Sequence, residues 1–336
     1  MVGQRLVQLL DGHPLFAVHE LFASDRSARR RYADACGWRL PTPLPASAAG
    51  LVVKGLEEPV ESSLVLSALP TAIAADLEER LADAGHVVCT NASAHRMDRD
   101  VPLLIPEINP EHLAAVGVQR ARRTSGGLLI ANSNCSAMGL VIALKPLADA
   151  FGLTRVSVTT LQAVSGAGYP GVPSLDAIDN IVPLIESEEH KMEIESRKIL
   201  GTWEGGAFHD AALELSATCT RVPVSDGHLE CVSVALTTTP STADICAVLR
   251  DFRSPVRDLG LPSSPDPLIV VSDAPDRPQP RLDRDAGRGM AVTVGRVRPC
   301  AVLGHKFVVL SHNTIRGAAG AAILNAELLH ARGLVG

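Results

Sequence analysis

The chain has 336 residues, of which 46% are hydrophobic and 20% charged, and its formal net charge is −6. This length favours two domains, and the composition excludes a disordered chain. Because charges of both signs are mixed along the sequence, the pattern gives no support for a nucleic-acid-binding surface or a polybasic membrane face, and a small-molecule partner fits better.

Cysteine usage and hydropathy restrict the compartment. The seven cysteines are widely spaced and contain no C-x-x-C pair, which argues against a disulfide framework and a zinc site and favours a reducing compartment. No apolar run reaches the length of a membrane span, and the first residues lack the order of a signal peptide. We therefore expect a cytoplasmic protein without a membrane segment or a metal site.

The first part of the chain alternates short apolar strands with helices. In chain order, the predicted elements are a helix at 3–10, strands at 15–23 and 63–69, a helix at 70–85 and a strand at 86–90. Such alternation is typical of a parallel sheet with crossover helices. Ligands of these sheets lie beyond the carboxyl ends of the strands.

The most informative stretch runs from residue 126 to 147. An apolar run at 128–131 is followed by polar residues, and Cys135 comes directly before a segment with helical periodicity. We expect a strand, a tight turn and a helix with Asn134 as its N-cap. The amides and positive dipole at the start of that helix favour a thiolate, although a free cysteine is more often a small buried hydrophobe.

Beyond this helix the strands become longer and the connections richer in turns. Strands are predicted at 154–164, 211–219, 228–238, 289–297 and 306–311. Other predicted features are a glycine-rich loop at 165–171, a charged helix at 186–200, a surface connection at 262–285 and a closing helix at 313–329. The pattern indicates a second domain with a mostly antiparallel sheet.

Five long motifs carry a family resemblance: NSNCSAMGLVIALKPL, LQAVSGAGYPGVPSLDAIDNIVP, RVPVSDGHLE, DRPQPRLDRDAGRGM and HNTIRGAAGAAILNAE. On them, the chain resembles the aspartate-semialdehyde dehydrogenases of archaea and fungi. The resemblance implies an α/β fold with a Rossmann-like NADP-binding domain, 1–134, completed by the C-terminal helix, 313–336. It also implies an α+β catalytic and dimerisation domain, 135–312, in a homodimer or homotetramer.

The implied reaction is NADPH-dependent reductive dephosphorylation of L-4-aspartyl phosphate to L-aspartate 4-semialdehyde, toward lysine, threonine, methionine and isoleucine. A thiolate, here Cys135, forms a thioester that links the phosphate and hydride steps.

His228 is the expected general acid and base, since imidazole titrates near working pH. Arg221 suits a carboxylate clamp, whereas on residue type alone it would be a surface arginine. By resemblance, Gln162 orients the substrate, and Asn134 with the Cys135 amide stabilises an oxyanion.

Further binding residues follow from the resemblance. Glu195 holds the substrate amino group, and Lys198 and Arg96 bind phosphate from two sides of a cleft, although Glu195 and Lys198 could also form only a surface ion pair. Serine and arginine side chains after the strand at 15–23 favour the 2′-phosphate of NADP over NAD. The expected NADP-binding residues are Val2, Gly3, Ser24, Arg26, Ser27, Ser67, Ser165, Gly166, Gly168 and Asn313.

The chain departs from the family pattern at its start. Family members open with a strand and a glycine-rich turn before the first helix, whereas this sequence begins inside that turn. We expect the first strand and the main pyrophosphate-binding amides to be missing. Either the start has been placed too far downstream, which we favour because the later catalytic positions are intact, or the protein is a shortened relative that binds NADP poorly.

Three other readings stay open on the sequence. A malonyl-CoA reductase would share the fold and the cysteine chemistry, and would accept CoA thioesters. An N-acetyl-glutamyl-phosphate reductase is chemically similar, but should lack the RVPVSDGH spacing. A catalytically impaired assembly partner would account for the missing N-terminal segment.

Overall fold

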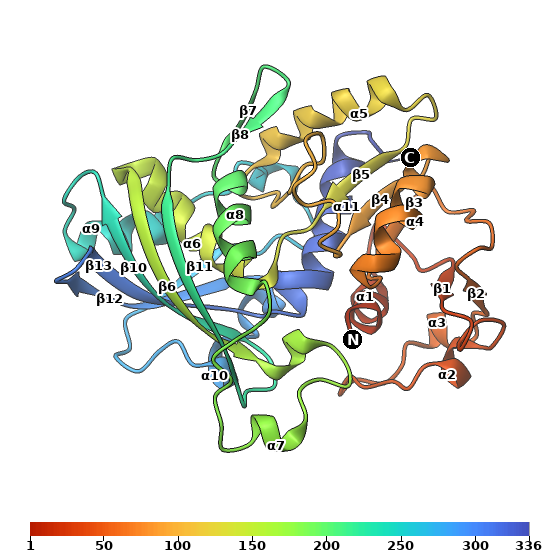
Figure 1. Cartoon of the computed structure of the whole chain (residues 1–336), viewed down its shortest axis with the longest axis horizontal. Coiled ribbons are helices and arrows are strands. Elements are labelled where there is room, and N and C mark those ends of the chain that lie inside the picture. The colour runs from red at the N-terminus through yellow and green to blue at the C-terminus, as the bar shows by residue number, and fades with distance from the viewer. Residues whose placement is uncertain (336) are drawn as a thin grey trace.

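The computed structural model describes residues 1–335, and Figure 1 shows an α/β chain in which helices surround two larger sheets. Two further pairs of short strands, β1-β2 and β7-β8, accompany them in this part of the chain. In the first part, β3, β4 and β5 form a parallel sheet, and β1 and β2 form a separate parallel pair. The strands are β1 (Leu21–Ala23), β2 (Val53–Gly55), β3 (Leu64–Ser67), β4 (Val87–Thr90) and β5 (Leu128–Ala131). The helices around them are α1 (Val2–Leu10), α4 (Thr71–Asp83), α5 (Val116–Arg122) and α11 (Gly320–Ala331).

The second part is a six-stranded sheet in the order β11-β12-β13-β10-β6-β9. Its strands are β6 (Leu153–Ala163), β9 (Glu214–Val222), β10 (His228–Leu236), β11 (Ile269–Ser272), β12 (Val292–Cys300) and β13 (Gly304–Ser311). Three of its five pairings are antiparallel, so the predicted mostly antiparallel sheet is confirmed. Helices α6 (Cys135–Phe151), α8 (Glu188–Ile199) and α9 (Thr242–Asp251) pack against this sheet.

Short elements connect these parts. They are α2 (Tyr32–Ala35), α3 (Ala46–Ala49), η1 (Pro110–Ala115), η2 (Val164–Ala167), α7 (Ser174–Ala177), β7 (Thr202–Glu204), β8 (Ala207–His209), η3 (Arg257–Leu259), α10 (Pro280–Asp283), η4 (Ala286–Gly289) and the π-helical η5 (Ile315–Ala319). The C-terminal helix α11 returns to pack on β3 and β4, far from the sheet that precedes it in sequence. None of the helices in residues 1–335 combines the length and apolar character needed to cross a bilayer.

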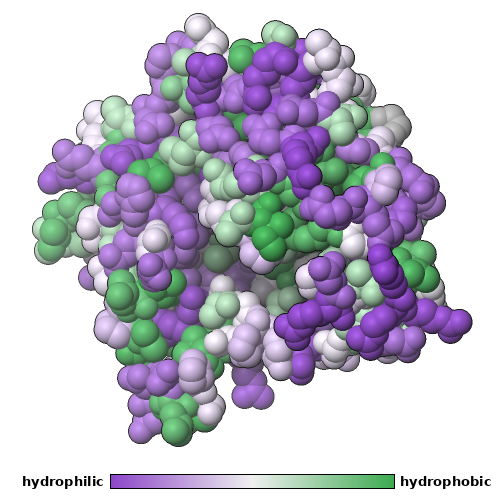
Figure 2. Space-filling view, turned by 45° about the vertical axis from the view of Figure 1, so that its right-hand side comes forward, coloured by the Kyte–Doolittle hydropathy of each residue, from purple (hydrophilic) through white to green (hydrophobic). Residues whose placement is uncertain are grey.

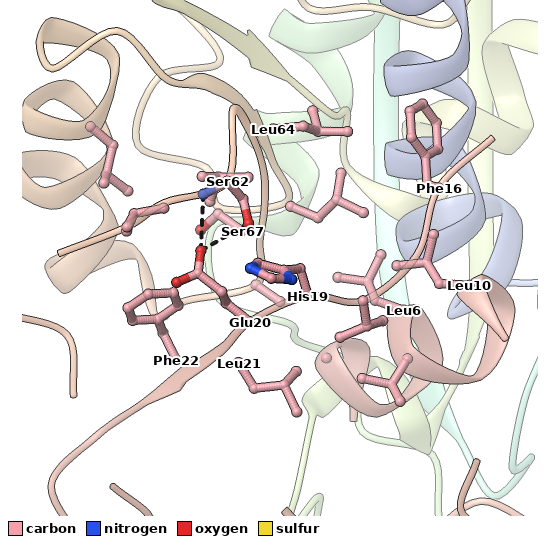
Figure 3. Close-up of a pocket in the computed structure, with 18 of the residues that line it drawn as sticks. Leu6, Leu10, Phe16, His19, Glu20, Leu21, Phe22, Ser62, Leu64 and Ser67 are labelled. Atoms are coloured by element: carbon pink, nitrogen blue, oxygen red, sulfur yellow. Dashed lines mark hydrogen bonds between the residues drawn. The ribbon is translucent and has the colours of Figure 1, made fainter. Parts of the chain in front are cut away.

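A slot separates the two small parallel sheets. It is a cavity of about 650 Å³ between residues 15–22 and β3, lined by apolar side chains that include Leu6 and Leu10 of α1 (Figure 3). Figure 2 shows the corresponding side of the molecule hollowed, with apolar side chains around the recess.

Backbone groups face the slot from both sides. The Ser67 carbonyl accepts from the backbone N–H of Asn91, the residue directly after β4. The backbone groups of Leu64 and Leu66 alternate with those that face β4, so they are directed toward the slot. Across the slot, the backbones of Ala17 and Val18 make no backbone hydrogen bond within residues 1–335. The expected Rossmann-like domain without its first strand is therefore confirmed.

Some predicted strand limits are wrong. Residues 15–20 are not a strand and only Leu21–Ala23 pairs, because the neighbour on the other side is the slot. The connection predicted at 262–285 contains β11, which pairs in parallel with β12 at the sheet edge. Strands β9 and β12 both begin three residues later than expected.

Candidate active site

The turn between β5 and α6 places Cys135 at the carboxyl edge of the first sheet. All of β5 is buried, and the chain leaves it through Asn134, whose Oδ1 accepts from the amides of Ser136 and Ala137. This confirms the predicted N-cap, and it fixes Cys135 as the first residue of α6. The Cys135 amide and the Asn134 Nδ2 donate to no residue within 1–335, so both are free to meet a developing oxyanion.

His228, at the start of β10, lies against the thiol from the second sheet. Its Nε2 is 3.3 Å from the Cys135 Sγ, and its Nδ1 accepts from the Ala163 amide at 3.0 Å. Because Nδ1 is an acceptor, the neutral ring carries its proton on Nε2 and directs it toward the sulfur. The two residues are 93 positions apart in sequence, yet the fold brings the predicted nucleophile and proton donor into contact.

The protonation states differ from the sequence-based expectation. Burial, reinforced by the positive charge of Arg221, lowers the pKa of His228 to about 3. Burial also raises the pKa of Cys135 to about 12; the Glu188 carboxylate adds to the rise, whereas Arg96 and Arg221 oppose it. Burial therefore acts against both the resting thiolate and the near-neutral imidazole that the sequence pattern favours.

These protonation states predict how fast Cys135 reacts with an alkylating agent. Because the pH range of the assay lies below the thiol pKa, iodoacetamide labelling of Cys135 is expected to rise about tenfold per unit from pH 7 to 10 without levelling. Replacing Glu188 with Gln should speed labelling at every pH, since it removes the carboxylate that raises the Cys135 pKa. Peptide-resolved mass spectrometry separates this cysteine from the others; a plateau below pH 8 would contradict the assignment.

Arg221 and Gln162 form a polar corner beside the thiol. The Arg221 Nη1 donates to the Ala163 carbonyl at 2.9 Å and to the Gln162 Oε1 at 3.4 Å, while its Nη2 donates to no residue within 1–335. A Cβ on Gly166 would lie 2.7 Å from that Nη1 and 3.1 Å from His228 Cε1. Any larger residue there would displace the Arg221 guanidinium, and one edge of this buried group stays open to a carboxylate.

Helix α8 and the loop after β4 supply a second charged group. The Arg96 Nη1 donates to the Glu195 Oε1 at 2.9 Å, and the other Glu195 oxygen accepts from the Asn134 amide at 2.7 Å. Both Glu195 oxygens are therefore occupied within the protein. Lys198 is buried, burial lowers its pKa to about 8, and its ammonium donates to the carbonyl oxygens of Arg96, Asp98 and Val101.

The expected NADP-binding residues fall at three places. Ser24 and Arg26 are exposed in the turn after β1, with Ser27 partly buried beside them, and Val2 and Gly3 open α1 with their amides free. Near the thiol, the Asn313 amide donates to the Ser165 hydroxyl at 2.8 Å and accepts from the Gly227 amide. Gly168, in the same loop, has a φ of +74° and open space around it. Ser67 instead donates to the Glu78 carboxylate, so it is committed to the interior.

Comparisons with known proteins decide the family. A model described as semialdehyde dehydrogenase, NAD binding domain, matches residues 1–116, and one described as semialdehyde dehydrogenase, dimerisation domain, matches residues 144–316. The aspartate-semialdehyde dehydrogenase of Archaeoglobus fulgidus is 47% identical, over 98% of this chain and 95% of that protein. The chain belongs to the aspartate-semialdehyde dehydrogenase family. The family member from Cryptococcus neoformans is 46% identical over 99% of this chain and 95% of its own.

Solved structures of the family share the whole fold. The aspartate-semialdehyde dehydrogenase of Candida albicans, a structure with NADP, is 44% identical, has a TM-score of 0.92, and matches 99% of this chain and 96% of that chain. Aspartate-semialdehyde dehydrogenase II of Vibrio cholerae is 29% identical with a TM-score of 0.76, over 98% and 95% of the two chains. The two-part architecture is therefore that of the family.

Two buried carboxyl groups near the thiol were not predicted. The Glu188 Oε1 accepts from the Gln162 Nε2 at 3.0 Å and from the Ser136 hydroxyl at 3.4 Å. Glu230, fully buried on β10, has no hydrogen-bond partner for either side-chain oxygen within residues 1–335, and burial followed by the Glu188 charge raises its pKa well above the usual value. The only sequence signal was the acidic pair Glu188 and Glu189 at the start of the charged helix. Such a pair is equally typical of a solvent-exposed helix end.

Proposed function

We propose that this protein reduces L-4-aspartyl phosphate to L-aspartate 4-semialdehyde with NADPH and releases phosphate. The observation that carries this proposal is the 3.3 Å contact between the Cys135 Sγ and His228 Nε2 at the edge of the first sheet, beside the open side of Arg221. A thiol, a proton donor and a carboxylate clamp are the groups that acyl transfer from a phosphorylated amino acid requires.

The acyl step uses this chain's own residues. The Cys135 sulfur attacks the acyl carbon and a C–S bond forms, while the C–O bond to phosphate breaks with its electron pair on phosphate. The leaving phosphate takes up the proton that the thiol gives up. The free Asn134 Nδ2, the Cys135 amide and the His228 Nε2–H are donors available to the carbonyl oxygen as it becomes negative. Arg96 and Arg221 favour the thiolate because both lower the pKa of Cys135.

NADPH, when bound, supplies the hydride that reduces the thioester to the aldehyde. The residues of this chain suit both ends of the cofactor, the 2′-phosphate and the nicotinamide. Exposed Ser24 and Arg26, with partly buried Ser27 beside them, suit a 2′-phosphate, and Ser165 with Asn313 forms a polar rim close to His228 for the nicotinamide end. Between them, the free amides at the start of α1 suit a pyrophosphate.

Arg221 is expected to act as a substrate clamp. Changing Arg221 to Lys removes the planar fork, so the KM for aspartate semialdehyde should rise at least about tenfold while kcat falls less. Steady-state kinetics with varied semialdehyde measure this split. Arg281→Lys, at an exposed position, is the matched control and should leave both constants unchanged; kinetics at Arg221→Lys equal to the control would mean that the carboxylate is held elsewhere.

The slot beside β3 predicts the effect of adding a strand. A chain extended before Met1 by a short apolar strand and a glycine-rich turn should gain roughly 2 kcal/mol in the free energy of unfolding after the cost of ordering, or about 5 °C in Tm, and should bind NADP more tightly. The matched control carries prolines in the added strand, which cannot donate to the open edges. Equal Tm and equal NADP affinity for the two extensions would contradict the expected strand site.

One assay tests the proposed activity. The purified chain is mixed with aspartate semialdehyde, NADP and phosphate, and formation of NADPH is followed by absorbance. We expect turnover that depends on all three reactants, and reduction of malonyl-CoA by NADPH to be much slower. No turnover with the strand-extended chain, or faster reduction of malonyl-CoA, would overturn the proposal.

We also propose a homodimer or homotetramer that works in the cytoplasm. The match of residues 144–316 to a dimerisation domain supports self-association. All seven cysteines are free, and a reducing compartment suits a catalytic thiol. Light scattering of the purified protein measures the assembly.

A further inference from the structure

The carboxylate of Glu188 lies inside the protein, where three elements meet. Glu188 is the first residue of α8, and it is buried. Its Oε1 accepts from the Gln162 Nε2, near the end of β6, at 3.0 Å and from the Ser136 hydroxyl, in the first turn of α6, at 3.4 Å. Because hydrogen bonds to a carboxylate are stronger than those between neutral groups, Glu188 is a firm anchor for the Gln162 amide.

Two other carboxylates fix the helix that carries Glu188. Strand β9 lies at the edge of the six-stranded sheet, next to β6. The Glu189 Oε1 accepts from the Cys219 amide of β9 at 3.0 Å, and the Glu193 Oε1 accepts from the Ala217 amide of the same strand at 3.3 Å. These bonds hold α8 along the edge strand, so the Glu188 side chain reaches past β9 to a residue of β6.

The bond to Glu188 sets which way round the Gln162 amide lies. The Nε2 has two N–H donors, and its acceptors are the Glu188 Oε1 and, at 3.3 Å, the Thr160 hydroxyl oxygen. The Gln162 Oε1 accepts from the Arg221 Nη1 at 3.4 Å. Reversing the amide would set its NH2 against the guanidinium and its carbonyl oxygen against the carboxylate, and both contacts would be unfavourable.

Gln162 in turn holds one half of the Arg221 guanidinium. The two residues are partners in the parallel register of β6 and β9, so their side chains lie on the same face of the sheet. The Arg221 Nη1 has two N–H donors, and it uses them on the Gln162 Oε1 and the Ala163 carbonyl. The Glu188 charge supports the same group, because burial lowers the pKa of Arg221 and the Glu188 carboxylate is among the groups that oppose this fall.

We propose that Glu188 is a positioning residue that acts through the Gln162 amide to hold the open side of Arg221 ready for the substrate carboxylate. This inference rests on the proposed function for its kinetic consequences. The carboxylate, the amide and the guanidinium form one chain of hydrogen bonds that runs from α8 through β6 to β9. Each group in this chain fixes the orientation of the next, and Glu188 is its charged end.

A double-mutant cycle tests whether Glu188 acts through Gln162. Glu188→Leu and Gln162→Leu are compared singly and together by the KM for aspartate semialdehyde, with Glu186→Leu, at an exposed position, as the matched control. We expect Glu188→Leu to raise this KM at least about tenfold with a smaller fall in kcat, and the double variant to lie within about twofold of Gln162→Leu. Single effects that multiply in the double variant, or kinetics of Glu188→Leu equal to the control, would overturn the proposal.

The side-chain amide of Gln162 provides a readout that needs no turnover. In proton–nitrogen NMR spectra, its NH2 signals are identified by their loss in Gln162→Leu. Hydrogen exchange of these signals should be at least about tenfold faster in Glu188→Leu than in the wild type, and unchanged in Glu186→Leu. Should Glu188→Leu fail to fold, Glu188→Gln, which keeps a carbonyl oxygen without the charge, should exchange at an intermediate rate.

This readout separates the proposed anchor from the proposed activity. Exchange at the wild-type rate in the folded Glu188 variants would overturn the anchor, whichever reaction the protein catalyses. Faster exchange in a protein that lacks turnover would support the anchor and count only against the proposed activity.

Discussion

Replacing Cys135 with serine is expected to lower phosphate-dependent turnover by a factor on the order of 10⁴ or more, while the fold stays intact. A serine hydroxyl is far less acidic than a thiol and would form an ester instead of a thioester. Burial already raises the pKa of the thiol at this position, so it should disfavour the ionised form of a serine hydroxyl as well. The measurement is NADPH formation by the purified variant at saturating reactants.

The control for Cys135→Ser is Cys231→Ser, because Cys231 is exposed on β10, in the same strand as His228. It should retain full activity, and both variants should give the far-ultraviolet circular dichroism of the wild type. Activity of Cys135→Ser above about 1% of wild type would remove Cys135 from the proposed mechanism.

The largest expected effect on stability comes from one buried ion pair. Arg316, in the π-helical η5, donates through Nη1 and Nη2 to the two oxygens of Glu107, each at 2.8 Å, and both side chains have no exposed surface. Changing Arg316 to Met leaves an unpaired buried carboxylate, so the free energy of unfolding should fall by about 3–5 kcal/mol. Urea unfolding followed by circular dichroism measures the loss.

A second change tests the cause of that loss. Combining Arg316→Met with Glu107→Leu removes the unpaired charge and should recover most of the stability, whereas Arg332→Met, at an exposed position, should change it by less than about 0.5 kcal/mol. A double variant as unstable as the single one would show that packing, not charge, is responsible. The pair also matters for the site, since a Cβ on the adjacent Gly317 would lie 2.5 Å from that of Cys135.

Local sequence signals predicted the elements that hold the nucleophile. The apolar run, Asn134 and the helical periodicity after Cys135 all lie within a few residues, and the structure has the strand, cap and helix as expected. The strand at 15–23 was predicted too long because strand formation depends on a partner that a local pattern does not contain. Strand β11 was missed because four residues between turn-rich segments carry little signal.

The charge state of the site could not be predicted from residue types. A cysteine at a helix start predicts a low pKa, but the burial that raises it comes from segments distant in sequence. Likewise, Lys198 and Glu195 at helical spacing predicted only that they share a face. That each is already bonded to the loop after β4 depends on how the two parts of the chain pack together.

The most direct test of the account is to look for the acyl group on the sulfur. The protein is mixed with aspartate semialdehyde and NADP without phosphate, quenched in acid and digested, and the peptide that contains Cys135 is weighed by mass spectrometry. We predict an aspartyl adduct on Cys135 alone, which phosphate discharges. Product formation with no adduct on Cys135, or with an adduct on another residue, would contradict the account.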